Sequence, residues 1–266
     1  MQGLLSDGTI IAVKQLSSKS KQGNHEFVNE IGMISALQHP HFVKLYGCWP
    51  QEYELKLDWP TRRKICVGVA RGLAYLHEVS RLKIVHRDIK ATNVLLDKNL
   101  NPKISDFGLA KLDEEDKTHI RTRVAGTYGY MAPEYAMRGY LTDKADVYSF
   151  GVVTLEIVSG MSNTGYRPKE DCFHLLNRAL VLKEKGSLLE LVDPRLGSNF
   201  KTKEVMVTIN VALLCTNVSP TVRPTMSAVV SMLEGRALVP KLVPDPSVSN
   251  DEMKVNALWK HFQHSK

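Results

Sequence analysis

The sequence lacks a long apolar run. Its longest uncharged stretch, residues 205–222, is interrupted by Asn210, Asn217, Ser219 and Pro220. A membrane-spanning helix needs about 20 consecutive, mostly apolar residues, and this stretch is too polar. The first eight residues hold two glycines, a serine and an aspartate, which break the apolar core that a signal peptide requires. We therefore expect no transmembrane segment and no secretory leader in this chain.

Cysteine is scarce and scattered. The four residues are Cys48, Cys66, Cys172 and Cys215. No pair has the short spacing of a zinc site, and the density is far below that of a disulfide scaffold. We expect four reduced, mostly buried thiols in a reducing compartment, which predicts a cytoplasmic location.

The charge balance is mildly basic. There are 35 Lys and Arg against 28 Asp and Glu, so the formal net charge is +7. The basic residues are dispersed and do not alternate with aromatic residues, so we expect no nucleic-acid partner. Contact with acidic lipid or an acidic peptide is equally compatible with this charge.

A length of 266 residues with 43% hydrophobic residues indicates one large globular domain or two lobes.

Hydrophobic periodicity predicts an α+β fold. Residues 9–16 have the β-branched alternation of a strand, which would place Ile10, Ala12 and Lys14 on one face. Apolar residues recur at helical spacing in several longer segments. The predicted helices cover 25–38, 58–79, 143–159, 204–215 and 225–233, and short strands are expected at 84–85, 94–96 and 103–105. The segment after Gly235 contains three prolines and reads as an irregular tail.

The segment 84–134 carries a recognisable order of polar residues. It contains His-Arg-Asp-Ile-Lys-Ala-Thr-Asn at 86–93, Asp-Phe-Gly at 106–108 and Ala-Pro-Glu at 132–134. Each triplet alone could be an ordinary turn or loop. Their order is specific, with five residues from Asp88 to Asn93 and thirteen more to Asp106. This pattern resembles the signature set of eukaryotic protein kinases, which implies a bilobal kinase-like fold.

The residue types suit phosphoryl transfer, which needs charge neutralisation and alignment more than covalent help. Asp106 and Asn93 offer the oxygen ligands that Mg²⁺ prefers, with Mn²⁺ as an alternative metal. Asp88 could accept the proton of a substrate hydroxyl. Lys90 could place a positive charge on the transferring phosphate, and Arg87 precedes the catalytic aspartate.

The resemblance extends upstream to the nucleotide site. Ala12-Val13-Lys14 matches the kinase strand that carries the phosphate-binding lysine, and Glu30 matches its ion-pair partner. The resemblance therefore implies ATP as cofactor, with Ala12 facing the base and Lys14 the phosphates. A lone lysine and a lone glutamate at such positions are more often solvated charges.

The resemblance also assigns structural and regulatory roles. Glu134 and Arg223 match a buried architectural pair, and Asp146 matches the residue that binds the catalytic-loop backbone. Lys90 and Thr127 match serine/threonine kinases, which implies protein substrates with Ser or Thr. An arginine before Asp88 is typical of kinases with a phosphorylated activation segment. The candidate acceptors are Thr118, Thr122 and Thr127, of which Thr127 is the weakest.

Within the kinases, the sequence motifs resemble those of plant leucine-rich-repeat receptor-like kinases. The similarity rests on Ser-Asp-Gly-Thr at 6–9, Asp-Trp-Pro-Thr-Arg-Arg at 58–63, Ala-Arg-Gly-Leu-Ala-Tyr-Leu-His at 70–77 and Val-Asp-Pro at 192–194. Relatives of this type place the kinase on the cytoplasmic side of the plasma membrane. The resemblance implies a co-receptor or another kinase as a further partner.

Two features of kinase sequences, the Gly-rich loop and the hinge region, have no counterpart in this sequence. The thirteen residues before Lys14 contain no Gly-x-Gly-x-x-Gly, and only nine residues, 49–57, separate Cys48 from Asp58. Nine residues reach about 30 Å when extended and cannot form the hinge, its leading strand and the following helix. The chain would be a gene-model or splice product, or a degenerate paralogue.

Two hypotheses follow from this sequence. The first is an active serine/threonine kinase, and the alternative is a non-catalytic kinase-like binding module that acts by docking partners. In either case we predict three parts: a partial small lobe at 1–57, a helical large lobe at 58–236, and the tail at 237–266.

Overall fold

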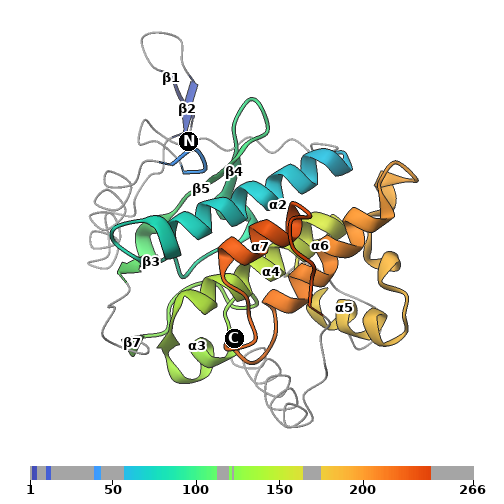
Figure 1. Cartoon of the computed structure of the whole chain (residues 1–266). Helices are drawn as coiled ribbons and strands as arrows, with labels where there is room; N and C mark the ends of the chain where they lie inside the picture. The colour runs from blue at the N-terminus through green and yellow to red at the C-terminus, as the bar shows by residue number, and fades with distance from the viewer. Residues whose placement is uncertain are drawn as a thin grey trace.

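The computed structural model describes most of the large-lobe region and short pieces before it (Figure 1). The described residues are 2–4, 10–12, 39–42, 57–112, 120–121, 123–163 and 175–240. For 2–4, 10–12 and 120–121 only the backbone is described. The predicted helix 25–38, with Glu30, and the side chains of Ala12 and Lys14 lie outside this set, as do Cys48 and Cys172.

Helix α2 (Trp59–Ala74) begins where the sequence predicts. The side chain of Asp58 caps it by accepting the backbone N–H of Thr61 at 3.0 Å, and Pro60 occupies the first turn, where no donor is needed. The predicted apolar stripe is buried throughout, at Ile65, Val69, Leu73 and Leu76. The last predicted turn widens into a π-helical turn, η1 (Tyr75–Val79).

Helix α4 (Asp143–Ser159) lies at the centre of the helical layer, as its uniformly apolar sequence predicts. It packs on α6 (Thr202–Cys215) and on α2, and α7 (Met226–Leu233) also packs on both α2 and α6 (Figure 1). Gly151 permits the close approach of α4 to α6, because a Cβ there would lie 2.7 Å from the carbonyl oxygen of Ala212. The sequence-based expectation missed α3 (Pro133–Arg138) and α5 (Leu175–Glu184).

The described strands form four antiparallel pairs of two strands each. They are β1 (Gln2–Leu4) with β2 (Ile10–Ala12), β3 (Ile84–Val85) with β6 (Lys111–Leu112), β4 (Val94–Leu96) with β5 (Pro102–Ile104), and β7 (Ile120–Arg121) with β8 (Tyr140–Leu141). The predicted strand 103–105 is displaced by one residue. Helices with few, short strands confirm the α+β class.

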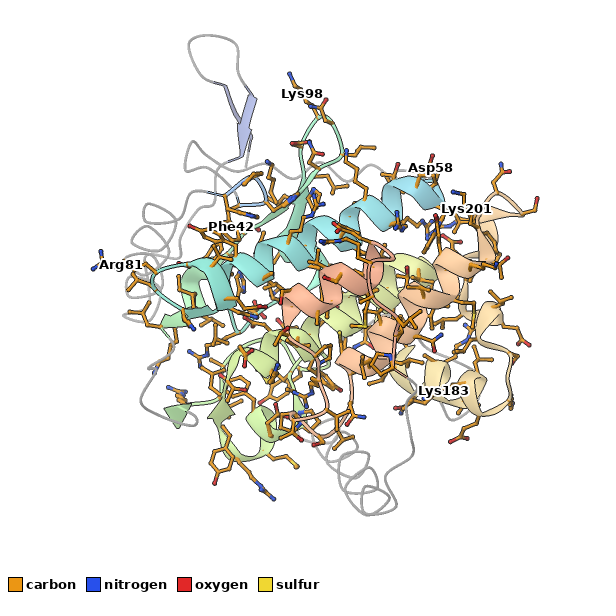
Figure 2. All side chains as sticks on the ribbon, viewed as in Figure 1. Phe42, Asp58, Arg81, Lys98, Lys183 and Lys201 are labelled. Atoms are coloured by element: carbon orange, nitrogen blue, oxygen red, sulfur yellow. The ribbon has the colours of Figure 1, made fainter. Side chains whose placement is uncertain are left out.

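Residues 39–42 pack against the large-lobe core. The backbone N–H of Ile104 donates to the carbonyl oxygen of His41 at 2.7 Å. Phe42, labelled in Figure 2, is buried, and its ring meets the Phe107 ring edge-on with centroids 5.7 Å apart. The Phe107 ring also contacts the His86 ring at 4.7 Å. This aromatic chain connects residues 39–42 with two of the loops that carry the predicted site.

The two cysteines in the described part of the chain accord with the expectation from the sequence. Cys66 and Cys215 are free and buried, and burial raises the pKa of each thiol to about 12. Within the described ranges, no helix combines the length and apolar character that a membrane crossing requires.

Candidate active site

The loop between β3 and β4 carries the predicted catalytic residues, and Asp146 of α4 holds its backbone. The Asp146 carboxylate accepts the N–H of His86 at 2.7 Å and the N–H of Arg87 at 2.8 Å. Arg87 has a φ of +73°, a left-handed conformation that is unfavourable for a residue with a side chain. The two bonds to one fully buried carboxylate hold this conformation in place.

The pKa of Asp146 reflects its partners. Burial by itself would raise the pKa, but hydrogen bonds from the His77 ring and the His86 backbone bring it below its ordinary value. His77 Nε2 lies 3.0 Å from Asp146 Oδ2. His77 was not singled out from the sequence, and only the tertiary structure reveals its contact with the catalytic loop.

His86 is buried and positions the loop from the other side. Its Nε2 lies 3.0 Å from the carbonyl oxygen of Ser105, and its Nδ1 lies 3.3 Å from the backbone N–H of Asp88. Burial lowers the pKa of His86, so the ring is neutral, donates from Nε2 and accepts at Nδ1. His86 therefore shapes the loop and is not placed to donate a proton to a substrate.

Asp88, Lys90 and Thr127 form a three-way cluster. Lys90 Nζ donates to Asp88 Oδ2 at 2.7 Å and to Thr127 Oγ1 at 2.9 Å, and Thr127 Oγ1 donates to Asp88 Oδ1 at 2.7 Å. Burial would raise the pKa of Asp88, but the hydrogen bonds from Lys90 and Thr127 lower it overall. Asp88 is therefore ionised at neutral pH and can accept a hydrogen bond from an incoming hydroxyl.

Asn93 lies beside Asp88, with its side-chain oxygen available. Its Nδ2 donates to the Asp88 carbonyl oxygen at 2.8 Å and to Asp88 Oδ2 at 3.2 Å. These bonds occupy the amide nitrogen, which leaves the amide oxygen for another partner. The Asn93 carbonyl oxygen accepts both the N–H and the hydroxyl of Ser105.

The β4–β5 pairing brings Asp106 to the same end of the hairpin as Asn93. Val94 faces Ile104 in the register, so the residues just before β4 and just after β5 are neighbours. Asp106 has a φ of +65° and precedes the 3₁₀ turn Phe107–Leu109. One carboxylate and one amide oxygen fit Mg²⁺, which is usually held by one or two protein ligands and by substrate phosphates. Among the described residues no cluster of three or more His, Cys, Asp or Glu could hold a metal.

The Arg87 side chain binds both ends of the segment 109–123, which follows Asp106. Its guanidinium donates to the carbonyl oxygens of Leu109 at 3.0 Å and Arg123 at 2.8 Å, and to the Tyr135 hydroxyl at 2.6 Å. The residues between these anchors include Thr118 and Thr122, which lie outside the described set. Their roles as phosphate acceptors therefore stay predictions.

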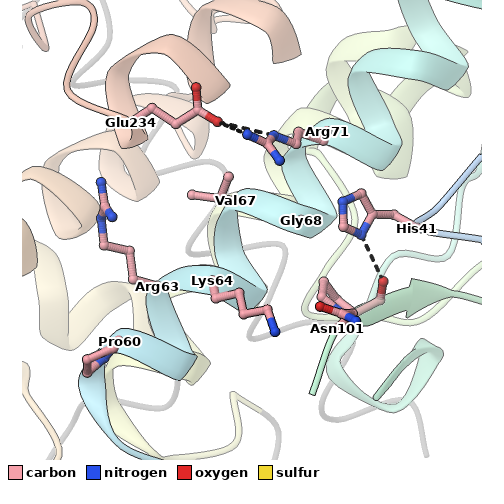
Figure 3. A pocket seen from close by; sticks show the side chains of 10 residues that line it. His41, Pro60, Arg63, Lys64, Val67, Gly68, Arg71, Asn101 and Glu234 are labelled. Carbon is pink, nitrogen blue, oxygen red and sulfur yellow. Dashed lines mark hydrogen bonds and ion pairs between the residues drawn. The ribbon is translucent and has the colours of Figure 1, made fainter. Parts of the chain in front are cut away.

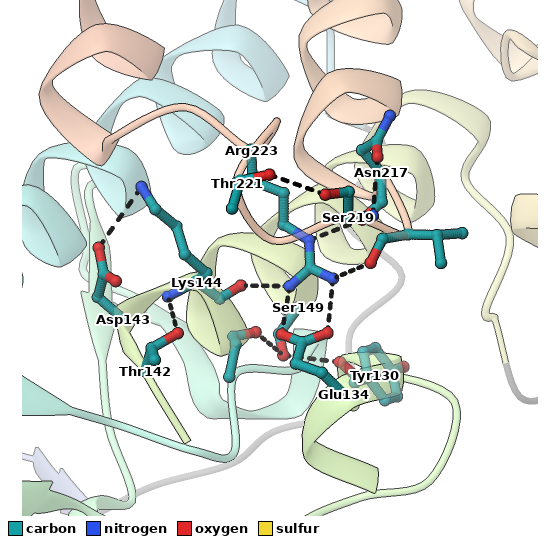
Figure 4. Close-up of polar contacts among 12 residues, drawn as sticks. Tyr130, Glu134, Thr142, Asp143, Lys144, Ser149, Asn217, Ser219, Thr221 and Arg223 are labelled. Carbon is teal, nitrogen blue, oxygen red and sulfur yellow. Dashed lines mark hydrogen bonds and ion pairs between the residues drawn. The ribbon is translucent and has the colours of Figure 1, made fainter. Parts of the chain in front are cut away.

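Glu134 and Arg223 form a largely buried, bidentate ion pair (Figure 4). Both distances between guanidinium nitrogens and carboxylate oxygens are 2.7 Å. The guanidinium also donates to the carbonyl oxygens of Asn217, Lys144 and Val218. The pair joins α3 to the loop between α6 and α7, and its hydrogen-bond partners in the described part of the chain do not include Asp88, Lys90 or Thr127.

Two cavities lined entirely by described residues adjoin these elements. One, of about 550 Å³, is lined by Lys90 and Thr127 and extends to α4. The other, of about 480 Å³, lies between α2 and the β4–β5 hairpin (Figure 3). It is lined by Arg63, Lys64 and Arg71, with Arg71 paired to Glu234. The first cavity reaches the Asp88 cluster and is the better candidate for a substrate site.

Comparisons with known proteins agree with this geometry. The sequence profile of the protein tyrosine and serine/threonine kinase family matches residues 51–233. Three Arabidopsis thaliana proteins named as probable leucine-rich repeat receptor-like serine/threonine-protein kinases are 63%, 67% and 66% identical to this chain. The matches cover 98%, 93% and 98% of the chain, which spans only 28%, 27% and 30% of the relatives' length.

The matches are also longer than the chain itself. They extend over 289, 276 and 290 residues, whereas the chain has 266. The relatives therefore carry residues inside the matched region that have no counterpart here. This difference accords with the short interval between Cys48 and Asp58, although that interval lies mostly outside the described residues.

Proposed function

We propose that this chain, which belongs to the protein tyrosine and serine/threonine kinase family, transfers the γ-phosphate of ATP to serine or threonine hydroxyls of protein substrates. The observation that carries the proposal is the cluster in which Lys90 bridges Asp88 and Thr127. It combines an ionised carboxylate with a fixed cation, Lys90, that lines a cavity. Both groups are needed where a hydroxyl attacks a phosphate.

Each residue of the cluster has a defined task in this proposal. Asp88 Oδ2 or Oδ1 receives the hydrogen bond of the substrate hydroxyl, orients its oxygen toward the phosphorus and takes its proton. Lys90 places its charge beside the transferring phosphate. Thr127 keeps Lys90 and Asp88 at a constant separation, which reduces reorganisation during transfer.

The nucleotide side of the site rests on Asn93 and Asp106, which would hold Mg²⁺ or Mn²⁺ through their side-chain oxygens. The metal, when bound, neutralises charge on the phosphates of ATP. Lys14, Ala12 and Glu30 complete the nucleotide site in the resemblance, and we propose the same roles for them here.

A second candidate function is a non-catalytic docking module. It is favoured by the residues that the relatives carry and this chain lacks, together with the nine-residue interval before Asp58. By analogy with the receptor-like relatives, either form would act at the cytoplasmic side of the plasma membrane. Its partners would be a Ser/Thr protein substrate and a co-receptor or another kinase.

A phosphotransfer assay separates the two functions. The purified chain is incubated with labelled ATP, Mg²⁺ and a mixture of peptides that contain Ser, Thr or Tyr, and the labelled amino acids are identified. Label on Ser and Thr that disappears in Asp88→Asn supports the kinase. Equal labelling by the unmodified chain and by Asp88→Asn would reject the role of Asp88 as the group that accepts the substrate proton. No labelling by either protein would favour the docking module.

A further inference from the structure

The cavity between α2 and the β4–β5 hairpin has a basic lining (Figure 3). Its volume is about 480 Å³, and much of its wall is one face of α2. Three residues of that face are cationic: Arg63, Lys64 and Arg71. Among the described residues that line the cavity, only Glu234 is acidic. Three cations against one carboxylate leave an excess of positive charge in the lining.

Two of these cations have no acidic partner among the described residues. Arg63 Nη2 donates to the carbonyl oxygen of Leu233 at 2.7 Å, and Lys64 Nζ donates to that of Asn99 at 2.8 Å. A guanidinium carries five donors and an ammonium three, so each cation has donors left for a ligand. The two bonds also place the cations on different sides of α2. Arg63 reaches toward the end of α7, and Lys64 reaches toward the hairpin turn.

The third cation shares its acidic partner. Arg71 donates to Glu234 Oε1 from Nη2 at 2.5 Å and from Nε at 3.1 Å (Figure 3). Arg236 contacts the other oxygen of the same carboxylate. The Arg71 and Arg236 side chains are 55% and 63% exposed. An incoming carboxylate can therefore bind Arg71 without leaving Glu234 unpaired.

The positive charge near the cavity also acts on His41, which lines it. Burial is the largest cause that lowers the pKa of His41, and the charges of Lys103 and Arg71 lower it further. The carbonyl oxygen of Pro102 and the Asp97 carboxylate oppose this effect but do not reverse it. His41 is therefore neutral at neutral pH. The positive charge of the lining comes from arginine and lysine, which keep it throughout the physiological pH range.

The cavity has a closely packed floor. A Cβ at Gly68 of α2 would lie 2.3 Å from Pro102 Cγ and 2.9 Å from His41 Cε1, so the helix, the hairpin and residues 39–42 are in direct contact there. Such a recess can take the side chains of one extended segment. A bilayer surface would instead contact projecting groups, so the shape favours a peptide over a membrane.

The cavity is separate from the candidate active site. Asn101 and Pro102 line it at the turn end of the β4–β5 hairpin. Asn93 and Asp106 flank the opposite end of that hairpin. Asp88 and its two partners in the cluster are not part of the cavity lining. A ligand bound in this cavity therefore leaves the Asp88 cluster accessible.

We propose that this cavity docks an acidic segment of a partner protein, in which two carboxylates bind the cations on the two sides of α2. One carboxylate binds Lys64 on the hairpin side, and the other binds Arg63 or Arg71 on the α7 side. The cations provide the charge complementarity, and their separation requires acidic residues a short distance apart in the partner. The inference goes beyond phosphoryl transfer, because it applies equally to an active kinase and to a docking module.

Binding measurements with matched peptides, in the absence of ATP, test the proposal. In a series of short peptides, two glutamates are separated by an increasing number of alanine and serine residues. Each peptide has a partner in which glutamine, which is neutral and nearly the same shape, replaces both glutamates. We expect the unmodified chain to bind the glutamate peptide about tenfold more tightly for at least one spacing, the sum for two or three partly exposed ion pairs. Equal affinities at every spacing would overturn the proposal.

The variant Lys64→Glu connects the preference with the cavity. Lys64 is exposed, so the reversal of its charge should leave the fold unchanged. We expect the preference for glutamate peptides to be lost while the glutamine peptides bind as before. The matched control is Lys185→Glu, which makes the same change of charge at an exposed position just after α5, outside the cavity lining. Equal loss in both variants would show that only the net charge matters and would exclude the site.

Vesicles test the membrane as the other source of negative charge. We expect vesicles that contain phosphatidylserine to bind the unmodified chain and Lys64→Glu with affinities no more different than those of the unmodified chain and Lys185→Glu. Vesicle binding that depends on Lys64, without any preference for glutamate peptides, would assign the cavity to a membrane and overturn the proposal. Because no measurement requires transfer, a failure of the phosphotransfer assay leaves these outcomes unaffected. The comparison of glutamate with glutamine uses the unmodified chain and remains decisive if Lys64→Glu does not fold.

Discussion

The carboxylate of Asp146 accepts the backbone N–H of Arg87 at 2.8 Å, although the two residues are 59 positions apart in the chain. The bond holds Arg87 in a left-handed conformation immediately before Asp88. A helix in the centre of the core thus controls the geometry of the catalytic loop. Because the core is rigid, the position of the Asp88 carboxylate is determined before any substrate arrives.

We predict that Asp146→Asn lowers the free energy of unfolding by about 3 kcal/mol at neutral pH, because a buried anion that accepts several hydrogen bonds is replaced by a neutral amide. The pKa of Asp146 is lower in the folded than in the unfolded chain. Its contribution is therefore present above about pH 4 and is lost as the pH falls through the folded pKa.

Urea unfolding of the unmodified chain and of Asp146→Asn, from neutral pH to below about pH 4, measures this difference in the free energy of unfolding. The stability difference should narrow on the acid side of about pH 4. Glu184→Gln, at an exposed position, should show no such difference. A difference that is independent of pH would mean that Asp146 acts through shape and not through charge.

We predict that Arg223→Ala lowers the free energy of unfolding by roughly 3 kcal/mol or more, because it leaves the mostly buried Glu134 carboxylate unpaired. The matched control is Arg195→Ala. Arg195 also contacts a carboxylate, that of Asp193, but its side chain is 55% exposed, so we expect a loss below about 1 kcal/mol. Thermal unfolding of the two variants checks the contrast. Equal losses would disprove the structural importance of the Glu134 pair.

We predict that Asp88→Asn reduces phosphotransfer at least about 100-fold, because it removes the group that accepts the substrate proton. The fold should persist, since asparagine has nearly the same shape and can still accept one hydrogen bond. Asp97→Asn, in the β4–β5 turn, is the control and should keep its activity. Rates and melting temperatures are measured on the same preparations. A wild-type rate in Asp88→Asn would show that another group acts as the base.

We predict that the chain binds Mg-ATP about 30-fold more weakly than a version in which the longer segment of a relative replaces residues 49–57. The reason is the loss of about two backbone hydrogen bonds to the base, at about 1 kcal/mol each. Calorimetry with Mg-ATP and Mg-GTP on both versions makes the comparison. Tight, adenine-selective binding by the unmodified chain would contradict the prediction and would strengthen the kinase over the docking module.

Local sequence was sufficient for α2, α4, α6 and α7, although it missed α5. The cap and the apolar stripe of α2 show a helical period, and α4 stands out as a long and uniformly apolar segment. The two-residue strands β6, β7 and β8 were not predicted, because two residues are too few to show an alternation, although the equally short β3 was predicted. Helix α3 is too short for its pattern to stand out. The pairing of Lys14 with Glu30 lies outside the described residues and stays a prediction.

The sequence by itself determined the identity and order of the chemical groups: Asp88, Lys90, Asn93 and Asp106, at spacings that match the kinase pattern. Only the tertiary structure decided how they act together. Thr127 reaches Asp88 across 39 residues, and His77 meets Asp146 across 69, because helix packing and loop closure bring them there. The burial of the Glu156 carboxylate is likewise invisible in the sequence, since it depends on every element packed around that side chain.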